Sequence, residues 1–88
     1  MLKVYGASWC PHCRRAVRFL EENDIPHDYI EIEEQPDEVV KKVIEVNGGE
    51  DWVVPTLEFK GTWREGKVFD AEGLRADLER MGVIGRAS

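Results

Sequence analysis

The first third of the chain alternates between hydrophobic segments typical of strands and one segment with helical periodicity. Residues 2–5 form a short apolar run, which is typical of a buried central strand. From Pro11 the period becomes helical and stays so to about residue 22, with charged residues on the other faces. Pro11 suits the first helical turn, where its missing N–H has no intrahelical partner. Residues 27–32 predict a second strand, which completes a βαβ unit with a parallel strand pair.

The remaining pattern adds a helix, two strands and a final helix. We expect a helix to begin at Pro36 and to end at a Gly-Gly pair, because glycine tolerates the left-handed conformation of a helix cap. Residues 53–59 predict a third strand, and a shorter fourth strand is expected between residues 63 and 69. Asp70 is a natural N-cap for the last helix. The pattern therefore predicts an α/β fold, βαβ followed by ββα, with a four-stranded mixed sheet and helices on both faces.

Length and composition are those of one small globular domain. The chain has 88 residues, of which 42% are hydrophobic and 34% charged, and we expect residues 1–84 to form the domain and residues 85–88 a frayed tail. A net charge of −6 argues against a nucleic-acid partner, which needs a basic surface. No apolar run approaches the length of about 18 residues that a membrane span needs, so we expect no membrane partner. The first residues lack a signal-peptide pattern, and we expect a cytoplasmic monomer.

Both cysteines of the chain lie in one pentapeptide, Trp9-Cys10-Pro11-His12-Cys13, between the first strand and the first helix. Cys-x-x-Cys at such a turn is a redox arrangement, because the helix N-terminus offers unpaired N–H groups that favour a thiolate. Cys10 stands at this terminus, so we expect it to be the exposed nucleophile. Cys13 lies one turn further in, so we expect it to be the more buried, resolving thiol. The pentapeptide therefore predicts thiol–disulfide exchange.

The neighbours of the two cysteines are candidates for adjusting their chemistry. His12, if charged, would favour the Cys10 thiolate and a more oxidising couple; the alternative is an exposed spacer. Trp9 would shield one side of the turn or pack against the sheet. Pro11 stiffens the turn, and Arg14 is either a source of positive potential or an ordinary solvated residue.

The pentapeptide and the later segment Val54-Pro55-Thr56 together resemble the glutaredoxin family of the thioredoxin superfamily, in its prokaryotic, mycoredoxin-like branch. The resemblance covers nearly the whole chain. It implies a thioredoxin fold and a cis Val54–Pro55 bond beside the Cys-x-x-Cys turn. It also implies that the backbone of Val54 faces Cys10 and pairs with an extended substrate or a thiol co-substrate.

Two positions depart from the glutathione-using members of that family. Ala7 stands where many of them have a basic residue, and residues 67–72 lack their Gly-Gly pair before an acidic helix start. Asp70 could still receive the ammonium group of a small thiol, or it is a plain N-cap. We therefore expect no tightly bound cofactor, and glutathione, mycothiol, another low-molecular-weight thiol or a flavoprotein reductase all remain possible reductants.

The leading hypothesis is an enzyme, a dithiol oxidoreductase that reduces protein disulfides or mixed disulfides with a small thiol. Cys10 attacks, Cys13 resolves, and Val54, Pro55 and Asp70 contribute to substrate binding. An alternative is a zinc or iron–sulfur module that uses Cys10 and Cys13 with His12 and His27, although zinc prefers four ligands at characteristic spacings. Two further alternatives are a redox-inactive interaction module and an oxidant in place of a reductant.

Overall fold

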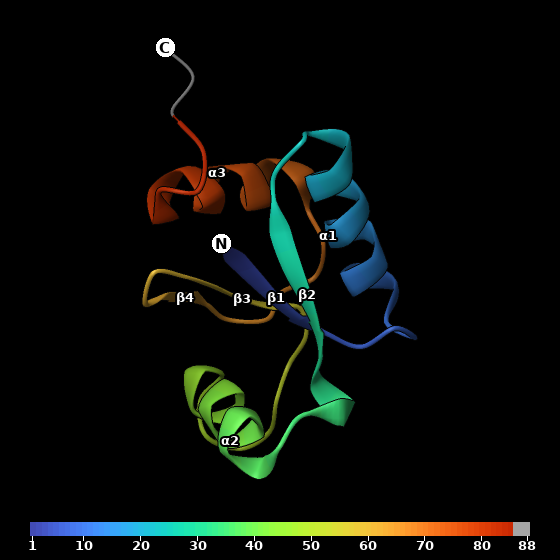
Figure 1. The fold of residues 1–88 in the computed structure, drawn as a ribbon, viewed down its shortest axis with the longest axis vertical. Coiled ribbons are helices and arrows are strands. Elements are labelled where there is room, and N and C mark those ends of the chain that lie inside the picture. Colours follow the sequence, from blue (N-terminus) through green and yellow to red (C-terminus); the bar gives the residue numbers. More distant parts are fainter. Residues whose placement is uncertain (86–88) are drawn as a thin grey trace.

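The computed structural model describes residues 1–85, and the mixed α/β pattern predicted from the sequence is confirmed in it (Figure 1). The elements in chain order are β1 (Leu2–Gly6), α1 (Pro11–Glu22), β2 (His27–Glu31), the 3₁₀ turn η1 (Ile32–Glu34), α2 (Asp37–Val46), β3 (Thr56–Phe59), β4 (Thr62–Arg64) and α3 (Ala71–Met81). Within the described residues no helix is long and apolar enough to cross a membrane.

The four strands form one mixed sheet in the order β2-β1-β3-β4. β1 pairs in parallel with β2, so that Gly6 lies opposite Glu31. The other two pairings are antiparallel: Tyr5 lies opposite Thr56, and Leu57 lies opposite Arg64. β1 is therefore a central strand, as expected for residues 2–5. The loop that leaves its carboxyl end leads to Cys10, and Cys13 follows in the first turn of α1.

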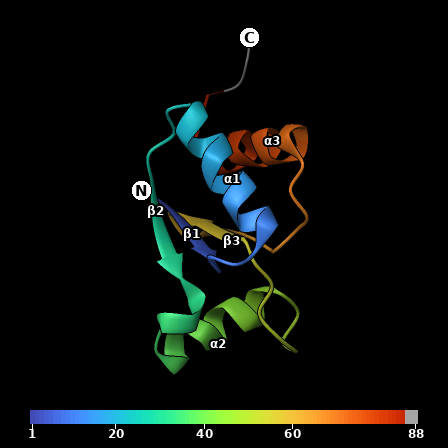
Figure 2. The same ribbon diagram turned by 90° about the vertical axis from the view of Figure 1, so that its right-hand side faces the viewer.

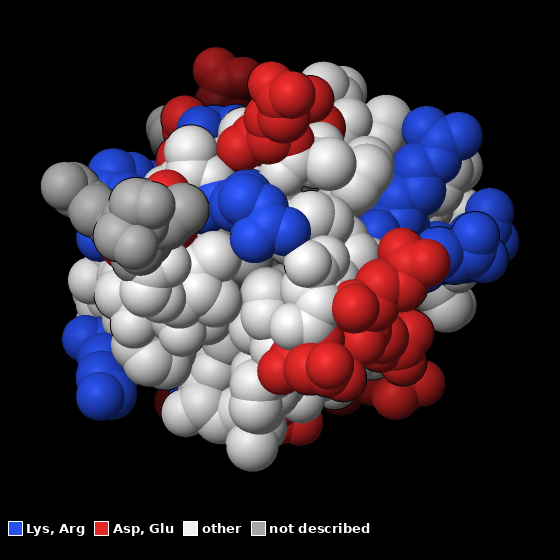
Figure 3. All heavy atoms as spheres, turned by 90° about the horizontal axis from the view of Figure 1, so that it is seen from above, with Lys and Arg blue, Asp and Glu red and all other residues white. Residues whose placement is uncertain are grey.

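Helices cover both faces of the sheet, as the two views show: α1 and α3 lie on one face and α2 on the other (Figures 1 and 2). Alternate residues of a strand point to opposite faces, so Leu2 and Val4 of β1 join the core under α1 and α3. Tyr5 joins a second apolar cluster on the α2 side, and both cysteines belong to that cluster. On the outer side of α1 and α3 both acidic and basic side chains reach the surface (Figure 3).

Three predicted element boundaries were wrong. β3 begins at Thr56 and not at Val53, because Pro55 has no N–H for the ladder and the Val53 carbonyl accepts the Thr56 hydroxyl at 2.6 Å. β4 ends at Arg64, and residues 65–70 form a loop in place of the expected longer strand. β2 ends at Glu31, where η1 replaces the last strand residue and part of the polar link.

The predicted helix caps are confirmed. The Asp70 carboxylate accepts the N–H of Gly73 at 2.9 Å, and Gly82 ends α3 with φ of 84°. α2 ends before Gly48 and Gly49, which have φ of 102° and 92°. Of the predicted frayed tail, residues 86–88 lie outside the described residues.

Candidate active site

Cys10 and Cys13 lie where β1 gives way to α1. Cys10 is the N-cap of the helix, with φ of −81° and ψ of 119°, and its carbonyl accepts the N–H of Arg14 at 3.1 Å. Its own N–H donates to the Ala7 carbonyl at 3.0 Å, which closes the loop before the helix. The Cys10 side chain makes no capping hydrogen bond. Its sulfur thus remains free for chemistry beside the unpaired N–H groups of the first turn.

The expectation that Cys10 is exposed was wrong. Its residue exposure is 7%, and that of Cys13 is 1%, so Cys13 is the more buried of the two, as expected. Cys10 is covered because it packs in the α2-side cluster, whose other buried members are Tyr5, Ala7, Ile32 and Val43. Both cysteines are free thiols, and they belong to the same buried cluster one helical turn apart. A dithiol at this spacing can close to a disulfide with little backbone movement.

The Cys13 thiol is held in its protonated form. Burial is the largest cause and raises its pKa to about 12, with the hydrogen bond and charge of Cys10 and the charge of Glu31 acting in the same direction. A backbone hydrogen bond from Ala7 opposes this rise. At neutral pH the Cys13 thiol is therefore overwhelmingly protonated. Cys13 therefore needs a proton acceptor before it can act as a nucleophile.

His12 holds a neighbouring loop. Its Nδ1 accepts the backbone N–H of Phe69 at 3.1 Å, which ties α1 to the segment before α3. This bond requires Nδ1 to carry no proton, so an imidazolium at this position would have to break it. Pro11 occupies the first helical position as expected, and Arg14 is exposed.

Trp9 stands out from the surface beside Cys10. It is 58% exposed, so it does not pack against the sheet, and its indole N–H donates to the Glu33 carboxylate at 2.7 Å. The preceding residue is held in the same way, since the Ser8 N–H donates to Glu31 Oε1 at 3.0 Å. Two carboxylates from the end of β2 and from η1 thus fix the loop that carries the first cysteine.

The Val54–Pro55 bond is cis, as the family resemblance predicts. Pro55 is buried, and Val54 packs against the cluster that contains Cys10 and Cys13. Asn47 fixes the adjoining segments: its amide donates to the Thr56 hydroxyl at 2.9 Å and its side-chain oxygen accepts the Gly66 N–H at 2.7 Å. The proline segment and the loop after β4 are therefore bound to the end of α2.

The two remaining candidate positions are accounted for by local structure. Asp70 uses one carboxylate oxygen, Oδ2, to cap α3, which matches the simpler of its two expected roles. Ala7 is fully buried, in the cluster that contains the two cysteines.

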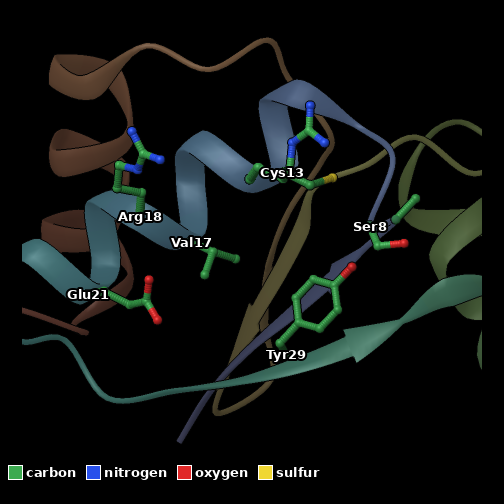
Figure 4. A pocket seen from close by; sticks show the side chains of 8 residues that line it. Ser8, Cys13, Val17, Arg18, Glu21 and Tyr29 are labelled. Atoms are coloured by element: carbon green, nitrogen blue, oxygen red, sulfur yellow. The ribbon is translucent and has the colours of Figure 1, made fainter.

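A groove of about 390 Å³ opens beside Cys13, between α1 and β2 (Figure 4). The residues that line it are Ala7, Ser8, Cys13, Arg14, Val17, Arg18, Glu21 and Tyr29. Tyr29 is 38% exposed. Its hydroxyl donates to Glu31 Oε1 at 3.0 Å, and burial, followed by this bond and the Glu31 charge, raises the pKa of Tyr29.

The proposed set of metal ligands is not gathered in one place. Among residues 1–85 no three side chains of His, Cys, Asp or Glu cluster as a metal site. His12 is engaged by Phe69, and His27 Nδ1 lies 2.9 Å from the Ile25 carbonyl. A closed structural zinc site would need four ligands, and the geometry brings only the two cysteines together.

The family model for glutaredoxin matches residues 2–63, which is more than half of the chain. The chain belongs to the glutaredoxin family. The "Glutaredoxin-like protein NrdH" of Lactococcus lactis subsp. lactis (strain IL1403) is 44% identical over 46 residues. That match spans 52% of this chain and 62% of the relative's length.

Two solved structures are similar over most of the fold. A glutaredoxin from Archaeoglobus fulgidus has a TM-score of 0.68 and 26% identity, over 85% of this chain and 82% of its own. A buckwheat glutaredoxin, solved as a glutathione complex, has a TM-score of 0.64 and 18% identity, over 93% of this chain and 70% of its own. At that identity the buckwheat protein supports the thioredoxin fold alone.

Sequence reasoning missed several residues that shape the site. Glu31 and Tyr29 lie beside Cys13 because β2 runs parallel to β1 and its carboxyl end meets the same edge of the sheet. Gly6 gives them room: a Cβ there would lie 2.9 Å from Tyr29 Cε1 and 3.3 Å from Cys13 Sγ. The parallel pairing was predicted, so Glu31 at the end of the second strand could have been marked as a neighbour of the cysteine turn.

Proposed function

We propose that the protein is a dithiol thiol–disulfide oxidoreductase, with Cys10 as nucleophile and Cys13 as resolving thiol. The observation that carries this proposal is the pair of free thiols in one buried cluster at the N-terminus of α1, which also packs against Val54 of the cis Val54–Pro55 segment. Membership of the glutaredoxin family supports the same reaction class.

The reaction runs in two exchanges. The Cys10 thiolate attacks one sulfur of the substrate disulfide, forms a mixed disulfide and releases the other sulfur as a thiolate. The Cys13 thiolate then attacks Cys10 Sγ, closes the Cys10–Cys13 disulfide and releases the second substrate thiolate. Two electrons pass from the dithiol to the substrate. An external thiol or reductase returns the protein to its dithiol form.

The residues around Cys10 bind the substrate. Val54 lies outside the strands, because β3 begins only at Thr56. Among the described residues, its backbone also takes part in none of the hydrogen bonds of turns, loops and caps. An extended disulfide-bearing segment can therefore pair with Val54 as an added strand. Three large hydrophobic side chains on segments near the site are exposed to solvent: Trp9 by 58%, Val53 by 44% and Val68 by 68%. They can contact apolar side chains of a protein substrate.

The reducing partner is a low-molecular-weight thiol or a flavoprotein reductase. Asp70 retains a carboxylate oxygen that can receive the ammonium group of glutathione or of a similar thiol, while Oδ2 caps α3. We further propose a cytoplasmic monomer made of one domain over residues 1–84, where a reducing environment would keep both thiols free.

Disulfide reduction by the Cys10→Ser and Cys13→Ser variants tests the assignment. We expect Cys10→Ser to lose turnover on an insulin-like protein disulfide and Cys13→Ser to accumulate a mixed disulfide visible by mass spectrometry. Full activity of Cys10→Ser would refute the proposal.

The oxidised wild-type protein is then offered glutathione, mycothiol, or thioredoxin reductase with NADPH. The fastest reduction identifies the partner. In a separate measurement, metal bound to the purified protein would favour the zinc or iron–sulfur alternative.

A further inference from the structure

Glu31 is a half-buried carboxylate whose hydrogen-bonding capacity is only half used. Oε1 accepts the N–H of Ser8 and the hydroxyl of Tyr29, each at 3.0 Å. Oε2 is buried and has no partner, and it is the only such side-chain atom in the part of the chain that the structure describes. A buried carboxylate oxygen without a donor is unfavourable, because it has lost water and gained nothing in return. An incoming proton would satisfy it.

The proton that the resolving step must move is that of the Cys13 thiol, whose pKa the Glu31 charge helps to raise. The position of a Cβ on Gly6 lies 3.3 Å from Cys13 Sγ and 2.9 Å from Tyr29 Cε1, so the thiol and the phenol ring occupy adjoining space. Both line the same groove, where Tyr29 points its hydroxyl toward the end that holds Cys13 and Ser8 (Figure 4). The Tyr29 hydroxyl can accept from the thiol while it donates to Glu31.

We propose that the Glu31 carboxylate receives the proton of the Cys13 thiol in the resolving step, with the Tyr29 hydroxyl as the link between them. This inference rests on the proposed function. The Cys13 S–H bond breaks, the proton passes to the Tyr29 oxygen as the Tyr29 proton passes to Glu31, and the carboxylate becomes a carboxylic acid. The Cys13 thiolate attacks Cys10 Sγ, the Cys10–substrate disulfide breaks, and the substrate leaves as a thiolate. Glu31 later returns its proton to solvent through the groove.

The charges around Glu31 decide what its removal would do. The groups that face this region are Cys10, Cys13, Arg14, Arg18 and Glu21 of α1, Tyr29 of β2 and Glu33 of η1. In the mixed disulfide Cys10 carries no charge, while burial and the Glu31 charge still raise the pKa of Cys13. If Glu31 acted only through its charge, neutralising it would lower the pKa of Cys13 and accelerate the attack of Cys13 on the mixed disulfide. If Glu31 is the proton acceptor, neutralising it must slow resolution.

Reaction of the reduced protein with 5,5′-dithiobis(2-nitrobenzoate), followed by stopped-flow absorbance, separates the two steps. Attack by Cys10 releases the first nitrothiophenolate, and attack by Cys13 on the mixed disulfide releases the second. This leaving group departs without a proton, so the second phase reports on deprotonation of Cys13. Cys13→Ser identifies the second phase by abolishing it.

We expect Glu31→Gln to slow the second phase by about 10²-fold, the lower end of what proton transfer to a positioned group contributes. Its rate should rise about tenfold per pH unit, because hydroxide is then the remaining base, and the wild-type rate should rise less steeply. Tyr29→Phe should also slow the second phase. Glu34→Gln is the matched control, because Glu34 is exposed and its loss changes the net charge equally; it should leave both phases within about twofold.

A second phase that is unchanged or faster in Glu31→Gln would overturn the inference, and an unchanged second phase in Tyr29→Phe would overturn the link. Far-UV circular dichroism establishes that each variant is folded, and Tyr29→Phe serves as the test if Glu31→Gln is not. Absence of a second phase in the wild-type protein would instead overturn the proposed function. The two failures are therefore distinguishable.

Discussion

The ion pair between Arg64 and Asp77 joins β4 to α3, and its removal has a predictable effect on stability. Arg64 Nε lies 2.6 Å from Asp77 Oδ2, and the two side chains are only 5% and 19% exposed. Lys67 and Arg80 also reach Asp77, at 3.4 and 3.5 Å, but they are 46% and 57% exposed. The buried Arg64 guanidinium therefore depends on Asp77 more than the two surface cations do.

Asp77→Asn should lower the free energy of unfolding by about 3 kcal/mol. Breaking a buried pair from one side costs about 3–5 kcal/mol, because the remaining charge is left without a partner. The partial exposure of Asp77 places the expected value at the lower end of that range. The exposed Lys67 and Arg80 contribute at most about 1 kcal/mol each. Since small domains have about 5–15 kcal/mol in total, this loss is readily measured.

The pH dependence gives a second, independent signature. Burial of the Asp77 carboxyl acts to raise its pKa, but the hydrogen bond and charge of Arg64 and the charge of Lys67 lower the pKa below its ordinary value of 3.8. A lowered pKa in the folded state means that the stabilisation is fully present above the unfolded value and is lost as the pH falls through the folded value. The difference between wild type and Asp77→Asn should therefore shrink below about pH 4.

Urea unfolding at pH 7 and at pH 3 measures both effects. Asp28→Asn is the matched control, because Asp28 is exposed on β2 and has no ion pair among the described residues. The double variant Arg64→Met/Asp77→Leu should recover most of the lost stability, since it removes both charges. Equal losses in Asp77→Asn and Asp28→Asn at pH 7 would show that the pair is not a stabilising contact.

Two further substitutions test the packing behind the cysteines and the loop beside them. Gly6→Ala places a Cβ against Tyr29 and Cys13 and should destabilise the protein by about 1–3 kcal/mol in urea unfolding, whereas Gly85→Ala, which meets no atom within 4 Å, should be neutral. A neutral Gly6→Ala would mean that Tyr29 is free to move aside. His12→Ala removes the acceptor of the Phe69 N–H, so exchange of that amide, followed by NMR, should accelerate by up to about tenfold. An unchanged exchange rate would show that His12 does not hold this loop.

The order of strands and helices follows from local patterns in the sequence, namely hydrophobic periodicity and helix caps. The apolar run of residues 2–5, the helical period after Pro11 and the cap at Asp70 each depend on neighbours close in the chain. The boundaries of β3 and β4 were predicted poorly, because an apolar residue such as Val53 or Val68 does not reveal whether a ladder partner lies beside it. Ladder pairing is a property of the assembled sheet.

The sequence by itself determined that the two cysteines share one site, since two cysteines one helical turn apart at a helix N-terminus come together through local geometry alone. Only the tertiary structure decided their surroundings. The burial of Cys10, the placement of the Glu31 carboxylate near Cys13 and the attachment of His12 to Phe69 join residues that are far apart in the chain. Such contacts depend on how the sheet orders its strands, and no local period in the sequence records that order.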